Sequence, residues 1–108
     1  MMQRIGINGF GRIGRQVLRA IAESPAWSGI EVAAINGRGT PEQLALLFAF
    51  DSVYGRFPGS VRAVDNGIVV DDRFIAITQA ATPLETRWGD FGVDLVVEST
   101  GGFDADPR

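Results

Sequence analysis

The sequence contains no cysteine and no histidine among its 108 residues. The lack of cysteine excludes disulfides and thiolate nucleophiles, and the lack of histidine excludes imidazole acid–base catalysis. The two absences also remove the side chains that most often bind zinc. We therefore predict neither a catalytic residue nor a metal site in these residues.

Basic charge and long apolar runs are scarce as well. The net charge is −3, which gives no general attraction to nucleic acid or to an anionic membrane. No apolar run approaches the roughly 20 residues that span a bilayer, and the first residues lack the apolar core of a secretory signal. We expect a cytoplasmic protein with neither a nucleic acid nor a membrane as partner. A hydrophobic content of 45% is that of an ordinary globular domain.

The first half of the sequence predicts two strands, each followed by a helix. Residues 5–8 form a short apolar run that suits a buried strand, and residues 11–23 have helical periodicity. Residues 30–36 predict a second, mostly apolar strand. Thr40 and Gln43 have the spacing of a capping box, which predicts a second helix that reaches about residue 50.

The side chains of the two helices carry expectations about burial. The buried stripe of the first helix is expected at Ile13, Val17, Leu18 and Ile21. Arg15 and Arg19 lie away from this stripe, which favours a solvated helix face. The second helix is almost wholly apolar from residue 44 to residue 48, so we expect it to be well buried.

The second half of the sequence changes to a period of two. Residues 61–64 and 68–70 flank an Asp-Asn-Gly turn, which predicts a hairpin, while residues 51–60 are expected to form a loop. Further strands are expected at residues 74–78 and from residue 93. This order predicts the α/β class: a Rossmann-like, doubly wound, mostly parallel sheet with a small antiparallel hairpin insert, incomplete at the C-terminus. We expect one partial domain over residues 1–108.

Three glycines, Gly9, Gly11 and Gly14, separate the first expected strand from the first expected helix. In the G-x-G-x-x-G motif the first permits a tight turn, the second leaves room for a pyrophosphate, and the third lets the helix approach the strand. The free N–H groups of Arg12 and Ile13 then face the phosphates, aided by the helix dipole. A glycine-rich structural turn is the alternative. Because the motif lies within a strand–helix–strand unit, we predict dinucleotide binding.

The segment GINGFGRIGR at residues 6–15 closely resembles the opening of the phosphorylating glyceraldehyde-3-phosphate dehydrogenases. The resemblance continues through VAAIN (32–36), FDSVYGRFPG (50–59), WGDFGVDLVVESTG (88–101) and Phe103. It implies that the chain is the first part of that family's cofactor domain. The residues that it places around the cofactor are Asn8, Gly9, Phe10, Gly11, Arg12, Ile13, Asn36, Gly37, Ser99, Thr100, Gly101 and Phe103.

The sequence also departs from the family. Family members are longer and carry a cysteine nucleophile and a histidine base, whose thiolate attacks the aldehyde before hydride passes to the nicotinamide. Neither residue type is present, so we expect the catalytic domain to be absent and these residues alone to be inactive. The segment 80–82 replaces a charged segment of the family beside the adenine, which leaves the backbone carbonyl of Ala81 as the remaining contact.

A second departure concerns the choice of cofactor. Gly37 stands where NAD-binding members carry an acidic residue that accepts hydrogen bonds from the ribose hydroxyls. The absence of this acidic side chain removes repulsion toward a 2′-phosphate, and Arg38 offers such a phosphate a bidentate contact. The alternative is that residues 37–39 form a plain turn with a solvated arginine. We predict NAD or NADP as the cofactor, with tolerance of NADP favoured by Gly37 and Arg38.

Three interpretations of the chain stay open at this point. It is an N-terminal piece of a glyceraldehyde-3-phosphate dehydrogenase-like enzyme of carbohydrate metabolism, or a non-catalytic nucleotide-binding or interaction module, or a truncated gene product without independent function. The dinucleotide is the expected partner in the first two. In the second, a full-length relative or another copy of the chain is a further expected partner.

Overall fold

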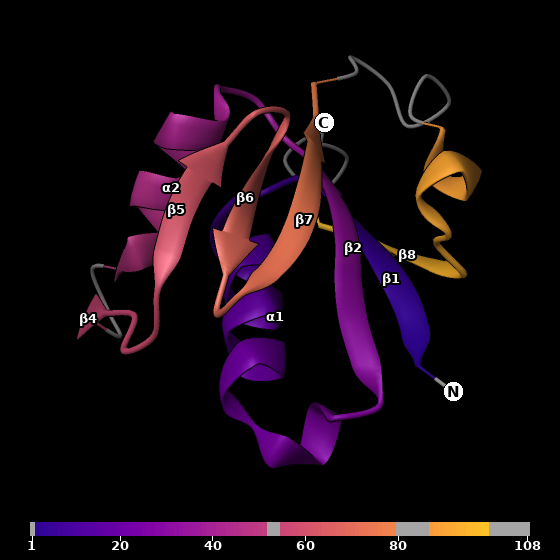
Figure 1. Cartoon of the computed structure of the whole chain (residues 1–108), viewed down its shortest axis with the longest axis horizontal. Coiled ribbons are helices and arrows are strands. Elements are labelled where there is room, and N and C mark those ends of the chain that lie inside the picture. Colours follow the sequence, from indigo (N-terminus) through magenta and orange to yellow (C-terminus); the bar gives the residue numbers. More distant parts are fainter. Residues whose placement is uncertain (1, 52–54, 80–86, 100–108) are drawn as a thin grey trace, which may run out of the picture.

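A six-stranded sheet forms the centre of the computed structural model, which describes residues 2–51, 55–79 and 87–99 (Figure 1). The strands lie in the order β5–β6–β7–β2–β1–β8. The parallel part comprises β1 (Gln3–Asn8), β2 (Ile30–Asn36), β7 (Arg73–Thr78) and β8 (Leu95–Glu98). The predicted Rossmann-like, mostly parallel sheet is confirmed. Its parallel strands follow the order 3-2-1-4 that is typical of this fold.

The antiparallel part extends the same sheet beyond β7. The strands β5 (Val61–Val64) and β6 (Gly67–Val70) form the predicted hairpin, with Asn66 at φ 63° in its turn. A second tight turn, with Asp71 and Asp72 at positive φ, pairs β6 with β7. A two-residue turn with both residues at positive φ matches the twist of a hairpin, which favours the antiparallel pairing of β6 with β7.

Two helices connect the strands and share one apolar core with them. The first is α1 (Arg12–Glu23), and the second is α2 (Pro41–Ala49), which begins with the predicted capping box between Thr40 and Gln43. The core joins buried side chains from both helices and from the strands, among them Ile7, Leu18, Ile35, Leu44, Phe48, Ile68 and Ile75. Within the described ranges, neither helix is long and apolar enough to cross a membrane.

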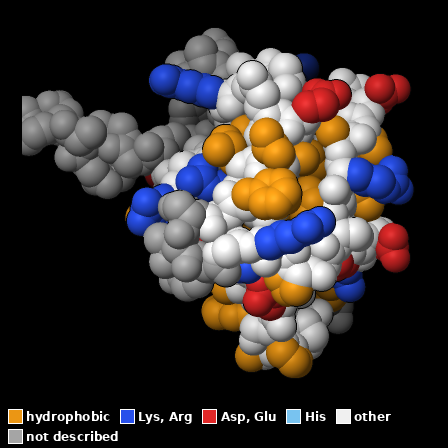
Figure 2. All heavy atoms as spheres, turned by 90° about the vertical axis from the view of Figure 1, so that its left-hand side faces the viewer, with side chains coloured by type: hydrophobic (Ala, Val, Ile, Leu, Met, Phe, Trp, Pro, Cys, Tyr) orange, Lys and Arg blue, Asp and Glu red, His pale blue; other side chains and the backbone are white. Residues whose placement is uncertain are grey.

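The predictions about burial in the helices are confirmed only in part. In the predicted stripe of α1, Leu18 is buried and Val17 and Ile21 are partly buried against the core, but Ile13 is 61% exposed. In α2 only one face is buried, so Leu46, at 63% exposure, and Leu47 point outward. Figure 2 shows apolar side chains gathered on the side of the molecule that carries α2 and β5, with arginines among them. A helix that is apolar all round does not reveal which face meets the sheet.

The prediction of a solvated arginine face on α1 is also wrong. The side chain of Arg19 is only 14% exposed, forms an ion pair with Glu23 at 2.8 Å, and donates to the backbone carbonyls of Gly55 and Arg56. Arg15 is half-buried and donates from Nη1 to the Phe10 carbonyl at 3.0 Å. Both arginines therefore hold loops against the helix rather than facing only water.

Part of the predicted loop at residues 51–60 is a short antiparallel pair. The strands β3 (Phe50–Asp51) and β4 (Gly55–Arg56) have two residues each. Two 3₁₀ helices, η1 (Pro25–Trp27) and η3 (Trp88–Phe91), were also not predicted. Elements of two to four residues are too short to show a periodicity in the sequence.

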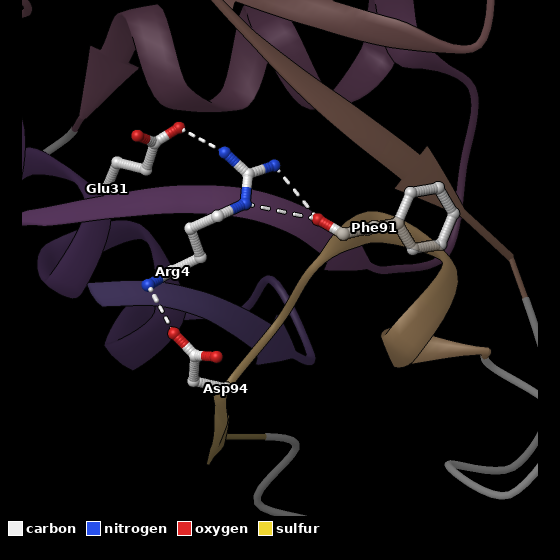
Figure 3. A network of polar contacts seen from close by, with 4 residues as sticks. All are labelled: Arg4, Glu31, Phe91 and Asp94. Atoms are coloured by element: carbon white, nitrogen blue, oxygen red, sulfur yellow. Dashed lines mark hydrogen bonds and ion pairs between the residues drawn. The ribbon is translucent and has the colours of Figure 1, made fainter. Parts of the chain in front are cut away.

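Arg4 fixes the segment that leads into β8 against the sheet (Figure 3). Its guanidinium donates to the Phe91 carbonyl at 2.9 and 3.3 Å and to the Glu31 carboxylate at 2.6 Å. Its backbone N–H donates to Asp94 at 3.1 Å. Because β8 begins directly after this segment, the contacts of Arg4 set where β8 starts along β1.

Candidate nucleotide-binding site

The turn between β1 and α1 has the geometry that its glycines predict. Gly9 lies at φ 100°, a conformation that residues with a side chain rarely adopt. Its N–H donates to the Asn36 carbonyl at 2.7 Å, which ties the turn to the end of β2. The side chain of Phe10 is buried in the core beside Phe48, so only the backbone of Phe10 borders the turn.

Gly14 brings α1 close to this turn. A Cβ atom added there would lie 2.3 Å from the Gly9 carbonyl oxygen and 3.0 Å from the Ser99 hydroxyl. Ser99 itself donates from Oγ to the Gly9 carbonyl at 2.8 Å, and its N–H donates to the Asn8 carbonyl at 2.9 Å. The structure therefore joins the end of β8 to the glycine turn.

Open space lies beside the N-terminus of α1. Gly11 is the N-cap, and a Cβ atom added to it would meet nothing within 4 Å. Gly11 has no side chain to accept from the first turn, so the N–H groups of Arg12 and Ile13 are available to a ligand there. A free helix N-terminus with room beside it suits a pyrophosphate. The residues present thus fit a dinucleotide.

Four polar side chains end the four parallel strands and form one line of hydrogen bonds. Thr78 donates from Oγ1 to Asn36 Oδ1 at 2.6 Å, and Asn36 donates from Nδ2 to Asn8 Oδ1 at 3.0 Å. Asn8 then donates from Nδ2 to the two Glu98 carboxylate oxygens at 2.9 and 3.1 Å. Sequence reasoning found Asn8 and Asn36 but missed Thr78 and Glu98. A polar residue at the end of each apolar strand was the available signal.

The turn at residues 37–39 follows β2 at the same edge of the sheet. The Gly37 N–H donates to the Thr78 carbonyl at 3.0 Å, and Gln79 donates from Nε2 to the Gly39 carbonyl. Arg38 is exposed and has no hydrogen bond or ion pair with any residue that the structure describes. The other predicted site residues, Ala81, Thr100, Gly101 and Phe103, lie outside the described residues.

A groove of about 360 Å³ lies at the opposite edge of the sheet. Leu18, Trp27 and Ile75 are among the residues that line it, beside the carboxyl end of α1. A helix carries partial negative charge at that end, which disfavours phosphates. Ligands of doubly wound sheets bind outside the carboxyl ends of the strands. The glycine turn is therefore the better candidate for a nucleotide site.

The sequence that forms this sheet and turn matches a family of known proteins. A family model described as "Glyceraldehyde 3-phosphate dehydrogenase, NAD binding domain" matches residues 3–106. The chain belongs to this family. The resemblance found in the sequence is thereby confirmed, and the described sheet and helices are those of a dinucleotide-binding domain for NAD.

Curated relatives carry the same family name. A "Glyceraldehyde-3-phosphate dehydrogenase 1" of Streptomyces arenae is 50% identical over 103 residues, which is 95% of this chain and 30% of the relative. A protein of the same name from Trichormus variabilis is 48% identical over 100 residues, or 93% of this chain and 28% of the relative. The glyceraldehyde-3-phosphate dehydrogenase of Lactococcus lactis is 44% identical over 103 residues, again 95% and 30%. The chain thus spans about 30% of the length of the curated relatives it matches.

Proposed function

We propose that the carboxyl edge of this sheet binds the adenosine and pyrophosphate half of NAD. The observation that carries the proposal is the free N-terminus of α1, which opens onto unfilled space at Gly11. In this proposal the N–H groups of Arg12 and Ile13 bind the pyrophosphate. Asn36 and Gly37 lie near the adenosine, and Ser99 forms part of the opposite wall together with Thr100, Gly101 and Phe103.

A calorimetric titration with 5′-AMP and with NAD tests this proposal. We expect weak binding, because we propose that these residues contact mainly the adenosine and pyrophosphate half of the cofactor. The expected dissociation constant is in the millimolar range, which corresponds to a binding free energy of about −4 kcal/mol. Gly11→Val places a side chain in the proposed phosphate position and should abolish binding. Gly29→Val is the matched control, since a Cβ atom there also meets nothing within 4 Å but lies at the other edge of the sheet.

Equal affinity of the Gly11→Val variant and the unchanged chain would contradict the phosphate site. Circular dichroism of both glycine variants checks that each remains folded, so that a loss of binding reports on the site. If only the Gly29→Val control lost binding, the result would indicate that the nucleotide binds in the groove beside Trp27.

Tolerance of NADP is a finer part of the proposal. The exposed guanidinium of Arg38, without a partner among the described residues, supports a contact with a 2′-phosphate. Solvent limits such a contact to about 1 kcal/mol, or roughly fivefold in affinity. Arg38→Ala should therefore weaken binding of 2′,5′-ADP by up to about fivefold and leave 5′-AMP unchanged. Arg62→Ala, at another exposed arginine on β5, is the control. If neither affinity changes in Arg38→Ala, the arginine is a solvated turn residue.

The proposed biological context is oxidation of glyceraldehyde 3-phosphate in the cytoplasm, as part of carbohydrate metabolism. The absence of cysteine and histidine supports a cofactor-holding role in which the nucleophile and base come from other residues. These residues alone, given glyceraldehyde 3-phosphate, phosphate and NAD(P), should form no reduced cofactor. Formation of reduced cofactor that persists after the protein is purified again would contradict the expectation that these residues alone are inactive.

Association with a full-length relative or with copies of the chain is the second candidate role. The exposed apolar side chains Leu46, Leu47 and Phe50 favour it, because a monomer rarely leaves such neighbours uncovered. Light scattering on the purified chain, alone and mixed with a full-length relative, tests it. A strictly monomeric chain that forms no complex would remove this candidate.

A further inference from the structure

The line of hydrogen bonds at the carboxyl edge has a single direction. An ionised carboxylate only accepts hydrogen bonds, whereas an asparagine amide has one donating and one accepting end. Because Glu98 accepts, Asn8 turns its Nδ2 toward Glu98 and its Oδ1 toward Asn36. Asn36 must then present its Oδ1 to Thr78, whose hydroxyl donates. The carboxylate on β8 thus fixes the orientation of three side chains.

Burial makes this orientation costly to reverse. Asn8 and Asn36 are 1% and 7% exposed, so water cannot satisfy a misdirected amide. If either amide turned over, two buried donors or two buried acceptors would face each other. The exposed Glu98 therefore determines the orientation of the buried side chains of Asn8 and Asn36 in the middle of the sheet.

The same strand ends also hold both turns of the nucleotide site. The Asn36 carbonyl accepts from the Gly9 N–H at 2.7 Å, and the Thr78 carbonyl accepts from the Gly37 N–H at 3.0 Å. The Asn8 carbonyl accepts from the Ser99 N–H at 2.9 Å. A change in how the side chains of Asn8, Asn36 and Thr78 pair across the sheet would therefore shift the backbone of the turns at Gly9 and Gly37.

We propose that Glu98 is a positioning residue of the nucleotide site. It orients Asn8, Asn36 and Thr78, and through them it keeps the turns at Gly9 and Gly37 aligned for the two ends of the adenosine diphosphate unit. The effect on binding rests on the proposed function. The orientation of the side chains does not, and can be measured without a nucleotide.

The test compares two replacements of Glu98 in the full 108-residue chain. Glu98→Gln keeps an acceptor oxygen in place, and Glu98→Met keeps the length but removes the acceptor. Glu23→Met, at an exposed glutamate at the far end of α1, is the control. The readouts are the side-chain amide resonances of Asn8 and Asn36 in ¹H–¹⁵N spectra and the affinity for 5′-AMP.

We expect Glu98→Met to shift both pairs of amide resonances and to weaken 5′-AMP binding about tenfold, the factor that corresponds to about 1.4 kcal/mol. Glu98→Gln should restore the resonances and most of the affinity, and the Glu23→Met control should change neither. Rescue by glutamine separates positioning from a direct charge effect, because glutamine carries no charge.

A second pair of variants tests the direction of the line. Asn8→Asp places a carboxylate against Glu98 and should lower the melting temperature, whereas adding Glu98→Gln supplies a donor and should recover at least half of the loss. If Asn8→Asp alone does not fold, folding of the double variant is the rescue. A double variant no more stable than Asn8→Asp contradicts the directed line.

The outcomes separate this proposal from the proposed function. If the unchanged chain binds no 5′-AMP, the proposed function fails, and the amide resonances still decide whether Glu98 orients the two asparagines. If Glu98→Met leaves those resonances in place, Glu98 positions nothing and the inference is overturned, even when 5′-AMP binds normally.

Discussion

Replacing Gly14 with alanine tests the close approach of α1 to the glycine turn. On helix propensity alone, alanine in place of glycine would stabilise α1 by about 1 kcal/mol. The added Cβ atom, however, would lie 2.3 Å from the backbone oxygen of Gly9 and 3.1 Å from Ile7 Cγ2. A backbone oxygen cannot rotate away as a side chain can, so either α1 or the turn must shift.

Crowding typically costs about 1–3 kcal/mol in a packed core, and a contact of 2.3 Å with a backbone oxygen places Gly14→Ala at the upper end of this range. Subtracting the gain in helix propensity leaves a net loss of about 2 kcal/mol, which lowers the melting temperature by roughly 8–16 °C for a chain of this size. Thermal unfolding followed by circular dichroism measures the difference. Gly29→Ala is the control, because its Cβ atom would meet nothing within 4 Å. A Gly14→Ala chain as stable as the unchanged chain would refute the described contact between α1 and the turn.

Three further outcomes follow from named contacts. A Cβ atom at Gly6 would lie 2.5 Å from the Trp88 ring, so Gly6→Ala should shift Trp88 fluorescence in a Trp27→Phe background. Gly29→Ala, whose Cβ atom meets nothing within 4 Å and which is far from Trp88 in the sequence, should not. Thr40→Ala removes the acceptor for the Gln43 N–H and should lower the free energy of unfolding by about 1 kcal/mol in urea titrations, while Thr40→Ser should retain it. Arg4→Met loses the contacts with Glu31 and Phe91 and should lower the urea midpoint more than Arg4→Lys does; equal midpoints for Arg4→Met and the unchanged chain would contradict the role given to Arg4.

Both α-helices and the strands of the main sheet followed from local patterns in the sequence. The strand at Ile30–Asn36 is an apolar run bounded by turn residues, and the start of α2 has its own capping box, so both were predictable without knowledge of the rest of the chain. Burial was less predictable. Whether Leu46 or Phe48 is buried depends on which side of α2 meets β5 and β6, and this contact is set by residues far away in the sequence.

The site was predictable where one segment contains it. Gly9, Gly11 and Gly14 lie within six residues, and each geometric role follows from the lack of a side chain. Glu98 lies 90 residues from Asn8, and nothing in either local segment indicates that the two meet. Their contact follows only from the parallel pairing of β1 with β8, which brings the ends of the two strands together.

Mapping the bound nucleotide by chemical shift tests the central claim most directly. In ¹H–¹⁵N spectra of the chain titrated with 5′-AMP, the account predicts the largest amide shifts at the carboxyl edge of the sheet. The residues concerned are Gly11, Arg12, Ile13, Gly37, Arg38 and Ser99. Largest shifts around the groove that Leu18 and Trp27 line, or no shifts at all, would contradict a nucleotide site at the glycine turn.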